Sequence, residues 1–153
     1  MRQPTFVNGA EIAFYLIGDG VGLTPPPALA VYVAHLRDRA ALHAPTWPRA
    51  STFADLDPRS QSLYRSIRAR LPASAEVYAT GSRVQGYWRS GLGIDPKTAL
   101  AARLGKPAES DVDVMVRGAD VVLCRRSMAE LADELGVAID LLRYRPPAIR
   151  VPD

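Results

Sequence analysis

The chain has 153 residues, of which 48% are hydrophobic and 23% are charged. This composition excludes a disordered or fibrous protein, and the length is enough for one domain, or for a small domain with an ordered extension. The formal net charge of +3 is too small to identify a nucleic acid partner, and the single cysteine, Cys124, permits no internal disulfide.

The start of the chain shows no pattern typical of a membrane span or of export. Its longest apolar run, residues 12–17, is far too short to cross a bilayer and lacks the form of a signal peptide. We therefore expect a cytoplasmic protein that has no membrane partner. Arginine outnumbers lysine 17 to 2, which would suit phosphate binding by guanidinium groups. A GC-rich genome produces the same bias, so both explanations stay open.

Residues 1–56 are predicted to form a partly helical N-terminal extension. Residues 27–42 have the apolar spacing of a helix, and residues 44–55 are typical of a loop or linker. His35 and His43 have no cysteine or acid at metal-ligand spacing, so we expect both to be ordinary polar positions.

Residues 57–144 are predicted to form a core of alternating helices and strands, with an insertion at 90–109 and an irregular tail at 145–153. The predicted class is α/β (α+β), in which helices accompany a small mixed sheet. The expected order is helix 58–71, strand 76–80, a helix after Ser82, an inserted helix 96–104, strand 111–116, a helix up to Gly136, and strand 137–144.

Three details of this core depend on local signals. Gly86 and Trp88 are expected on the helix after Ser82, where the missing side chain of Gly86 would let helix and strand approach closely. Trp88 either packs in the core or borders a ligand pocket. The capping-box pair Ser127 and Glu130 is expected to start the helix that ends at Gly136.

The turn Gly81-Ser82 lies between a predicted strand and a predicted helix. Unpaired backbone N–H groups at such a position favour an anion, such as a phosphate. Gly81 and Ser82 are therefore candidate phosphate-binding residues, and Arg83 is a weaker candidate for a phosphate contact.

Three acids form a candidate metal site. Asp111 and Asp113 alternate with valines, so on a strand both carboxylates project from one face. Asp140 lies in a later apolar strand, where an acid needs a partner; a metal ion would be one, and pairing with Arg143 is another. Oxygen ligands from carboxylates suit Mg²⁺.

The order of these motifs resembles the DNA polymerase β-like nucleotidyltransferase superfamily, in its minimal form. The resemblance covers residues 57–144, and the long segment 90–109 between the motifs departs from the family pattern. The matching residues are Gly81, Ser82 and Gly86, then Ser110, Asp111 and Asp113, then Asp140.

The resemblance implies transfer of a nucleoside monophosphate, with ATP the expected donor, to a hydroxyl of a protein or RNA acceptor. Asp111 and Asp113 would hold Mg²⁺ against the triphosphate in a two-metal site, and Asp140 would complete that site or accept the hydroxyl proton. Pyrophosphate would leave. Residues 1–56 would be the place for acceptor recognition, oligomer contacts or docking. The alternative is a catalytically silent fold that serves as a structural or docking component of a larger assembly.

Overall fold

The computed structural model describes residues 26–153, and this part of the chain divides into two compact units after His43. In the first unit, helix α2 spans Pro27–Leu42, as the apolar spacing predicts. Expectations for residues 1–25 lie outside the described residues. Within the described part, no helix combines the length and the apolar character that a bilayer crossing requires.

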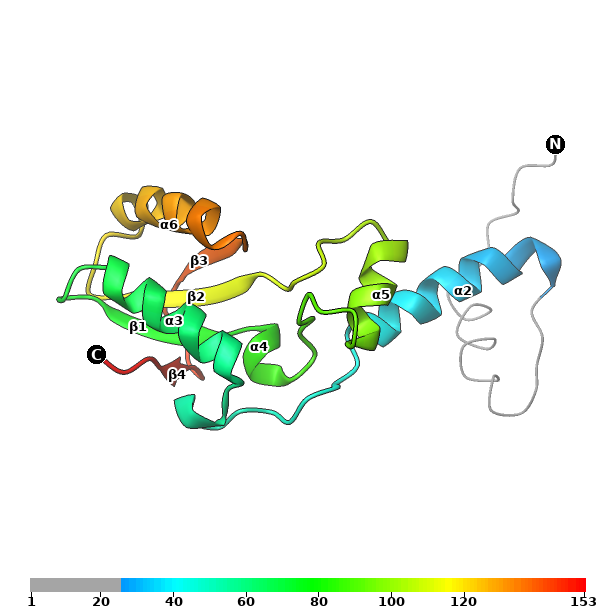
Figure 1. Cartoon of the computed structure of the whole chain (residues 1–153), viewed down its shortest axis with the longest axis horizontal. Helices are drawn as coiled ribbons and strands as arrows, with labels where there is room; N and C mark the ends of the chain where they lie inside the picture. Colours follow the sequence, from blue (N-terminus) through cyan, green and yellow to red (C-terminus); the bar gives the residue numbers. More distant parts are fainter. Residues whose placement is uncertain (1–25) are drawn as a thin grey trace. The chain divides into compact units, whose positions relative to one another are not determined.

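The second unit, residues 44–153, contains a four-stranded mixed sheet with helices, which confirms the α+β class. It begins at Ala44, whereas the sequence places the start of the core at residue 57. The elements in order are η2 (Phe53–Asp55), α3 (Pro58–Arg70), β1 (Glu76–Thr80), α4 (Ser82–Gln85), α5 (Pro96–Arg103), β2 (Val112–Arg117), α6 (Val121–Leu135), β3 (Ile139–Arg143) and β4 (Ile149–Arg150) (Figure 1).

The sheet has the strand order β3-β2-β1-β4. β1 runs antiparallel to both β2 and β4, whereas β2 and β3 are parallel. Asp113 on β2 is opposite Thr80 on β1 and Asp140 on β3. Because residues opposite each other point to the same face, this register brings the two acids to one side of the sheet.

One face of the sheet carries the hydrophobic core. Helices α3 and α6 lie against this face and contact each other (Figure 1). The strands alternate, so Val112, Val114 and Val116 are buried under the helices while Asp113 and Met115 face the other side. The acids therefore lie on the face that the helices leave open.

The segment after β3 is largely irregular, as the sequence predicts, but it also contains a short strand. It crosses the open face, where the Arg145 amide donates to Met115 Sδ (3.2 Å), and then adds the short strand β4 beside β1. Val151 is 1% exposed, and its amide donates to the carbonyl of Val77 (2.8 Å). The end of the chain is thus part of the core, held by pairing that is remote in sequence.

The helix after the Gly81-Ser82 turn is shorter than expected. α4 ends at Gln85, and Gly86 follows in a left-handed conformation (φ 94°). A Cβ at Gly86 would collide with the carbonyl oxygen of Trp47, so the close approach is to residues 44–50 and not to a strand. Trp88 lies beyond the helix, 6% exposed, and stacks on Trp47 with ring centroids 5.2 Å apart. The packing interpretation of Trp88 is confirmed.

The start of α6 also differs from its prediction. The side chain of Asp120 accepts a hydrogen bond from the Val122 amide (2.8 Å), and the helix begins at Val121, so Ser127 and Glu130 lie inside it. The inserted helix α5 agrees with the sequence, since Asp95 caps it and Pro96 opens it.

Candidate functional site

Three acids converge at one end of the open face. Asp111 directly precedes β2, Asp113 lies on it, and Asp140 lies on β3 in register with Asp113. One carboxylate oxygen from each can be chosen so that all lie within 4.8 Å of one another. Such a group of oxygen ligands could hold a metal ion. The predicted convergence of the three side chains is therefore confirmed.

Asp113 is the least exposed of these acids, and its environment disfavours its charge. Burial, followed by repulsion from Asp111 and Asp140, raises the pKa of Asp113 to about 6, against the opposing effects of the Ser82 amide and Arg83. The positive charge of Arg83 is thus too little to balance burial and the two neighbouring acids. A bound divalent ion would supply the missing positive charge.

The Gly81-Ser82 turn lies directly against Asp113. Gly81 has φ 76°, and a Cβ at this position would overlap the Asp113 carboxylate. The Ser82 amide donates to the same carboxylate, while the Ser82 hydroxyl oxygen is buried and has no hydrogen-bond partner among residues 26–153. The turn thus forms the wall of the acid cluster, and one of its amides is already engaged by an acid.

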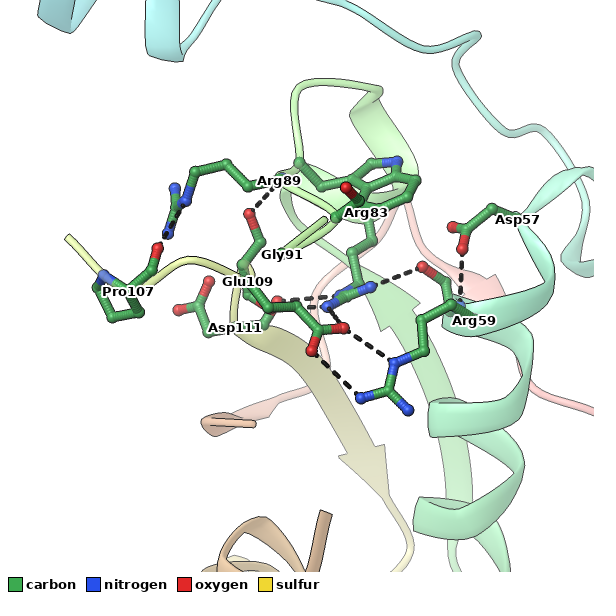
Figure 2. Close-up of polar contacts among 12 residues, drawn as sticks. Asp57, Arg59, Arg83, Arg89, Gly91, Pro107, Glu109 and Asp111 are labelled. Atoms are coloured by element: carbon green, nitrogen blue, oxygen red, sulfur yellow. Dashed lines mark hydrogen bonds and ion pairs between the residues drawn. The ribbon is translucent and has the colours of Figure 1, made fainter. Parts of the chain in front are cut away.

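Arg83 does not face the open site. Arg83 is 2% exposed, and its guanidinium donates to Ser60 Oγ (2.9 Å) and Glu109 Oε1 (3.1 Å). The same group also donates to the backbone carbonyls of Ser110 (2.7 Å) and Asp111 (3.2 Å) (Figure 2). These contacts fix the chain just before β2, so Arg83 acts by positioning Asp111 and is not placed to contact a phosphate.

Glu109 joins this arginine to a second one. Arg59 on α3 binds both Glu109 oxygens, at 3.0 and 3.2 Å (Figure 2). Burial works to raise the pKa of Glu109, but the hydrogen bonds from Arg59 and Arg83 prevail and lower it. Helix α3, α4 and the segment leading into β2 are thereby joined by one charged network.

Tyr64 is a positioning residue that the sequence analysis missed. Its side chain is fully buried, and its hydroxyl lies 2.7 Å from the carbonyl oxygen of Asp113 and 3.2 Å from that of Thr80. Burial raises the pKa of Tyr64, so the hydroxyl stays protonated and donates. In the sequence Tyr64 follows Leu63 in an apolar helix stripe, which is the pattern of an ordinary core residue.

No family model, curated protein or solved structure matches the chain. The three acids, the turn beside them and the residues that hold both are therefore the features that indicate a function.

Proposed function

We propose that this protein is a Mg²⁺-dependent nucleotidyltransferase that moves a nucleoside monophosphate from a nucleoside triphosphate, with ATP the expected donor, to a hydroxyl of a macromolecular acceptor. The observation that carries the proposal is the convergence of Asp111, Asp113 and Asp140 beside the Gly81-Ser82 turn. The same elements, in the same order, underlie the resemblance to the polymerase β-like nucleotidyltransferases.

The three carboxylates fit the proposed cation. They offer only oxygen atoms, which Mg²⁺ prefers, and two of the three are exposed and so accessible to a triphosphate. When bound, the ion neutralises charge on the phosphates and on the leaving group. Asp111 and Asp113 would hold the ion, and Asp140 would complete the site.

The transfer makes one bond and breaks another. The oxygen of the acceptor hydroxyl attacks the α-phosphorus, an O–P bond forms, and the bond from the α-phosphorus to the bridging oxygen of pyrophosphate breaks. The hydroxyl proton passes to a carboxylate, for which exposed Asp140 is the candidate. Catalysis of this kind depends mainly on positioning and charge neutralisation.

The turn supplies the candidate phosphate contacts. The buried Ser82 hydroxyl has no hydrogen-bond partner among the described residues, so a phosphate oxygen is a suitable partner for it. Gly81 keeps the turn free of a side chain next to Asp113. Arg83 is not included in this role because protein oxygens surround its guanidinium.

One observation favours the alternative of a silent docking component. The Ser82 amide donates to Asp113, and Arg83 is turned inward, so two of the expected phosphate donors are occupied within the protein. In a protein without activity, these two hydrogen-bonded contacts would serve only to stabilise the fold.

A labelling experiment separates the two functions. Purified protein is incubated with each α-³²P nucleoside triphosphate, Mg²⁺ and cell extract, and the label on protein and RNA is measured. We expect transfer with the unaltered chain and with Asp133→Asn, an exposed acid on α6 outside the cluster, and no transfer with Asp113→Asn. Absence of transfer, together with absence of Mn²⁺ binding by calorimetry, would leave the docking alternative.

A further inference from the structure

The outer edge of β3 adjoins the acid cluster and carries free backbone groups. β3 ends the sheet, and no described strand pairs with its outer side. The Val112 amide donates to the carbonyl of Ala138, and the Tyr144 amide donates to that of Val116. In a parallel pair, only every second residue of a strand forms backbone hydrogen bonds with the neighbouring strand. Residues 138, 140, 142 and 144 therefore bond to β2, whereas Ile139 and Leu141 direct N–H and C=O outward.

A cavity lies along this edge. Its volume is about 220 Å³, and α6 and β3 line it with Arg125, Met128, Ala129, Ile139, Asp140 and Leu141. Asp140 thus borders both the cavity and the acid cluster. Arg125 is exposed, and its guanidinium has no hydrogen bond or ion pair among residues 26–153, whereas its neighbour Arg126 pairs with Glu130 (3.3 Å). The cavity therefore combines a mainly polar surface, apolar side chains from α6 and β3, an adjoining peptide edge and one available positive charge.

We propose that an extended segment of a partner protein adds to this edge as a fifth strand and presents the acceptor hydroxyl to the acid cluster. This inference rests on the proposed function, and it names a polypeptide as the acceptor class. Outward backbone groups on β3 complement another peptide strand. They offer no row of cationic groups that would bind the phosphates of an RNA strand.

The pleat of the sheet defines the acceptor further. A residue opposite Asp140 on an added strand has its side chain on the open face, within about 5 Å of the aspartate between Cβ atoms. A Ser, Thr or Tyr there would place its hydroxyl at the cluster. The next residue on either side points toward α6 and Arg125. An acidic residue there would pair with the guanidinium, so the recognised segment has a hydroxyl residue directly beside an acidic one.

In the transfer, this side-chain oxygen attacks the α-phosphorus of the nucleoside triphosphate and forms a phosphodiester to the peptide. The bond to pyrophosphate breaks, pyrophosphate leaves, and Asp140 or water takes the hydroxyl proton. No oxidant or further reactant is needed.

Peptide binding tests the inference without nucleotide or metal. Three blocked heptapeptides each have a central threonine. The two residues that flank this threonine are both Glu in the first peptide, both Gln in the second and both Lys in the third, and the peptides are otherwise identical. Each is titrated into the ¹⁵N-labelled full chain. We expect the Glu peptide to shift the amides of Ile139 and Leu141, and to bind about tenfold more tightly than the Lys peptide.

Two pairs of variants assign the contacts. Arg125→Glu should reverse the preference between the Glu and Lys peptides, whereas Arg126→Glu, on the same helix but outside the cavity, should leave it unchanged. Ile139→Pro removes one outward N–H at the first residue of β3, where proline is tolerated, and should weaken all three peptides about tenfold. Ile139→Val keeps that N–H and should bind as the unaltered chain does.

Several outcomes would overturn the inference. One is the absence of saturable binding of any peptide up to about 1 mM. A second is a charge preference that Arg125→Glu leaves intact. A third is a dimer of the unaltered chain that Ile139→Pro converts to monomer, because a second copy of the chain would then occupy the edge. Transfer of label to RNA alone would also exclude it. Peptide binding without any nucleotidyl transfer would instead support the docking edge and contradict the proposed function.

Discussion

At the scale of single residues, position 81 between the turn and the acid cluster requires glycine for two independent reasons. Its φ of 76° is one that residues with a side chain rarely adopt, and a Cβ would overlap the Asp113 carboxylate. We expect Gly81→Ala to lower the free energy of unfolding by about 3 kcal/mol. Urea denaturation followed by circular dichroism measures this loss.

Gly105 provides a matched control for Gly81. It has φ 66°, close to that of Gly81, but a Cβ added there would meet no atom within 4 Å. Gly105→Ala should therefore cost about 1 kcal/mol, the backbone contribution alone. Equal losses in the two variants would mean that the contact between the turn and Asp113 has no energetic weight.

Asp113 makes stability depend on pH in a defined direction. Its pKa is raised from 3.8 to about 6, so the folded state binds this proton more tightly than the unfolded state does. The stabilisation due to the proton is present below about pH 4 and is lost as the pH rises through about 6. In the absence of divalent cations, the ionised site therefore destabilises the protein at neutral pH.

Asp113→Asn should remove this pH-dependent loss. Because Asn keeps an acceptor for the Ser82 amide and carries no charge, we expect the variant to be more stable than the unaltered chain at pH 7.5 by about 1 kcal/mol, after allowance for solvent screening. The difference should fall to near zero at pH 4. Thermal denaturation in EDTA across this range measures it, and a constant difference would show that Asp113 does not titrate near pH 6.

At the scale of elements, the hydroxyl of Tyr64 connects α3 to β1 and β2 beside the acid cluster. Tyr64→Phe would leave the carbonyls of Thr80 and Asp113 without this donor in a buried place. We expect a loss of about 1 kcal/mol in the free energy of unfolding. Weaker Mn²⁺ binding should accompany it, because the backbone of Asp113 loses a constraint; calorimetry measures this.

Tyr78→Phe controls for the loss of a tyrosine hydroxyl as such. The Tyr78 hydroxyl contacts Glu76 (3.1 Å) on the open face of the sheet, away from the helices. Its removal should change stability by a few tenths of a kcal/mol, within about 0.5, and leave Mn²⁺ binding unchanged. If both variants weaken Mn²⁺ binding equally, Tyr64 has no special positioning role.

The sequence predicts the acid cluster well because its signals are local and periodic. Alternation of acids with valines places Asp111 and Asp113 on one face, and an acid within an apolar strand marks Asp140. Long-range pairing then brings the two strands together in register. The local pattern was sufficient because each strand has only one face that suits an acid.

Features that depend on partners far away in sequence leave no local signal that could predict them. Arg83 follows a phosphate-type turn, yet Glu109 and two backbone carbonyls draw its guanidinium inward. β4 has two residues, too few for a period, and forms because β1 offers a free edge. For α6, Ser127 and Glu130 predict a later start, but the helix begins at Val121 with Asp120 as its cap, and Val121 packs against the core.

At the scale of the whole molecule, the second unit contains the three acids, the turn beside them and the described residues that position both. Its core cluster runs from Ala50 to Val151, and the segment before α3 contributes Ala50, Phe53 and Leu56 to it. The amides of Thr46 and Trp47 both donate to the carbonyl of Gly86 (2.8 Å each). Residues 44–56 therefore belong to the folded unit, although their composition is typical of a linker.

Two truncated chains test where this unit begins. A chain of residues 44–153 should unfold cooperatively and bind Mn²⁺ as the full chain does, because its core and acid cluster are complete. A chain of residues 57–153 loses the buried side chains of Ala50, Phe53 and Leu56, and the stacking of Trp47 on Trp88. At about 1.5–3 kcal/mol for each large buried side chain, that loss is comparable to the whole stability of a domain. We expect circular dichroism to show that the shorter chain is unfolded. A cooperative unfolding transition of this chain would show that residues 44–56 are not required for the core to fold.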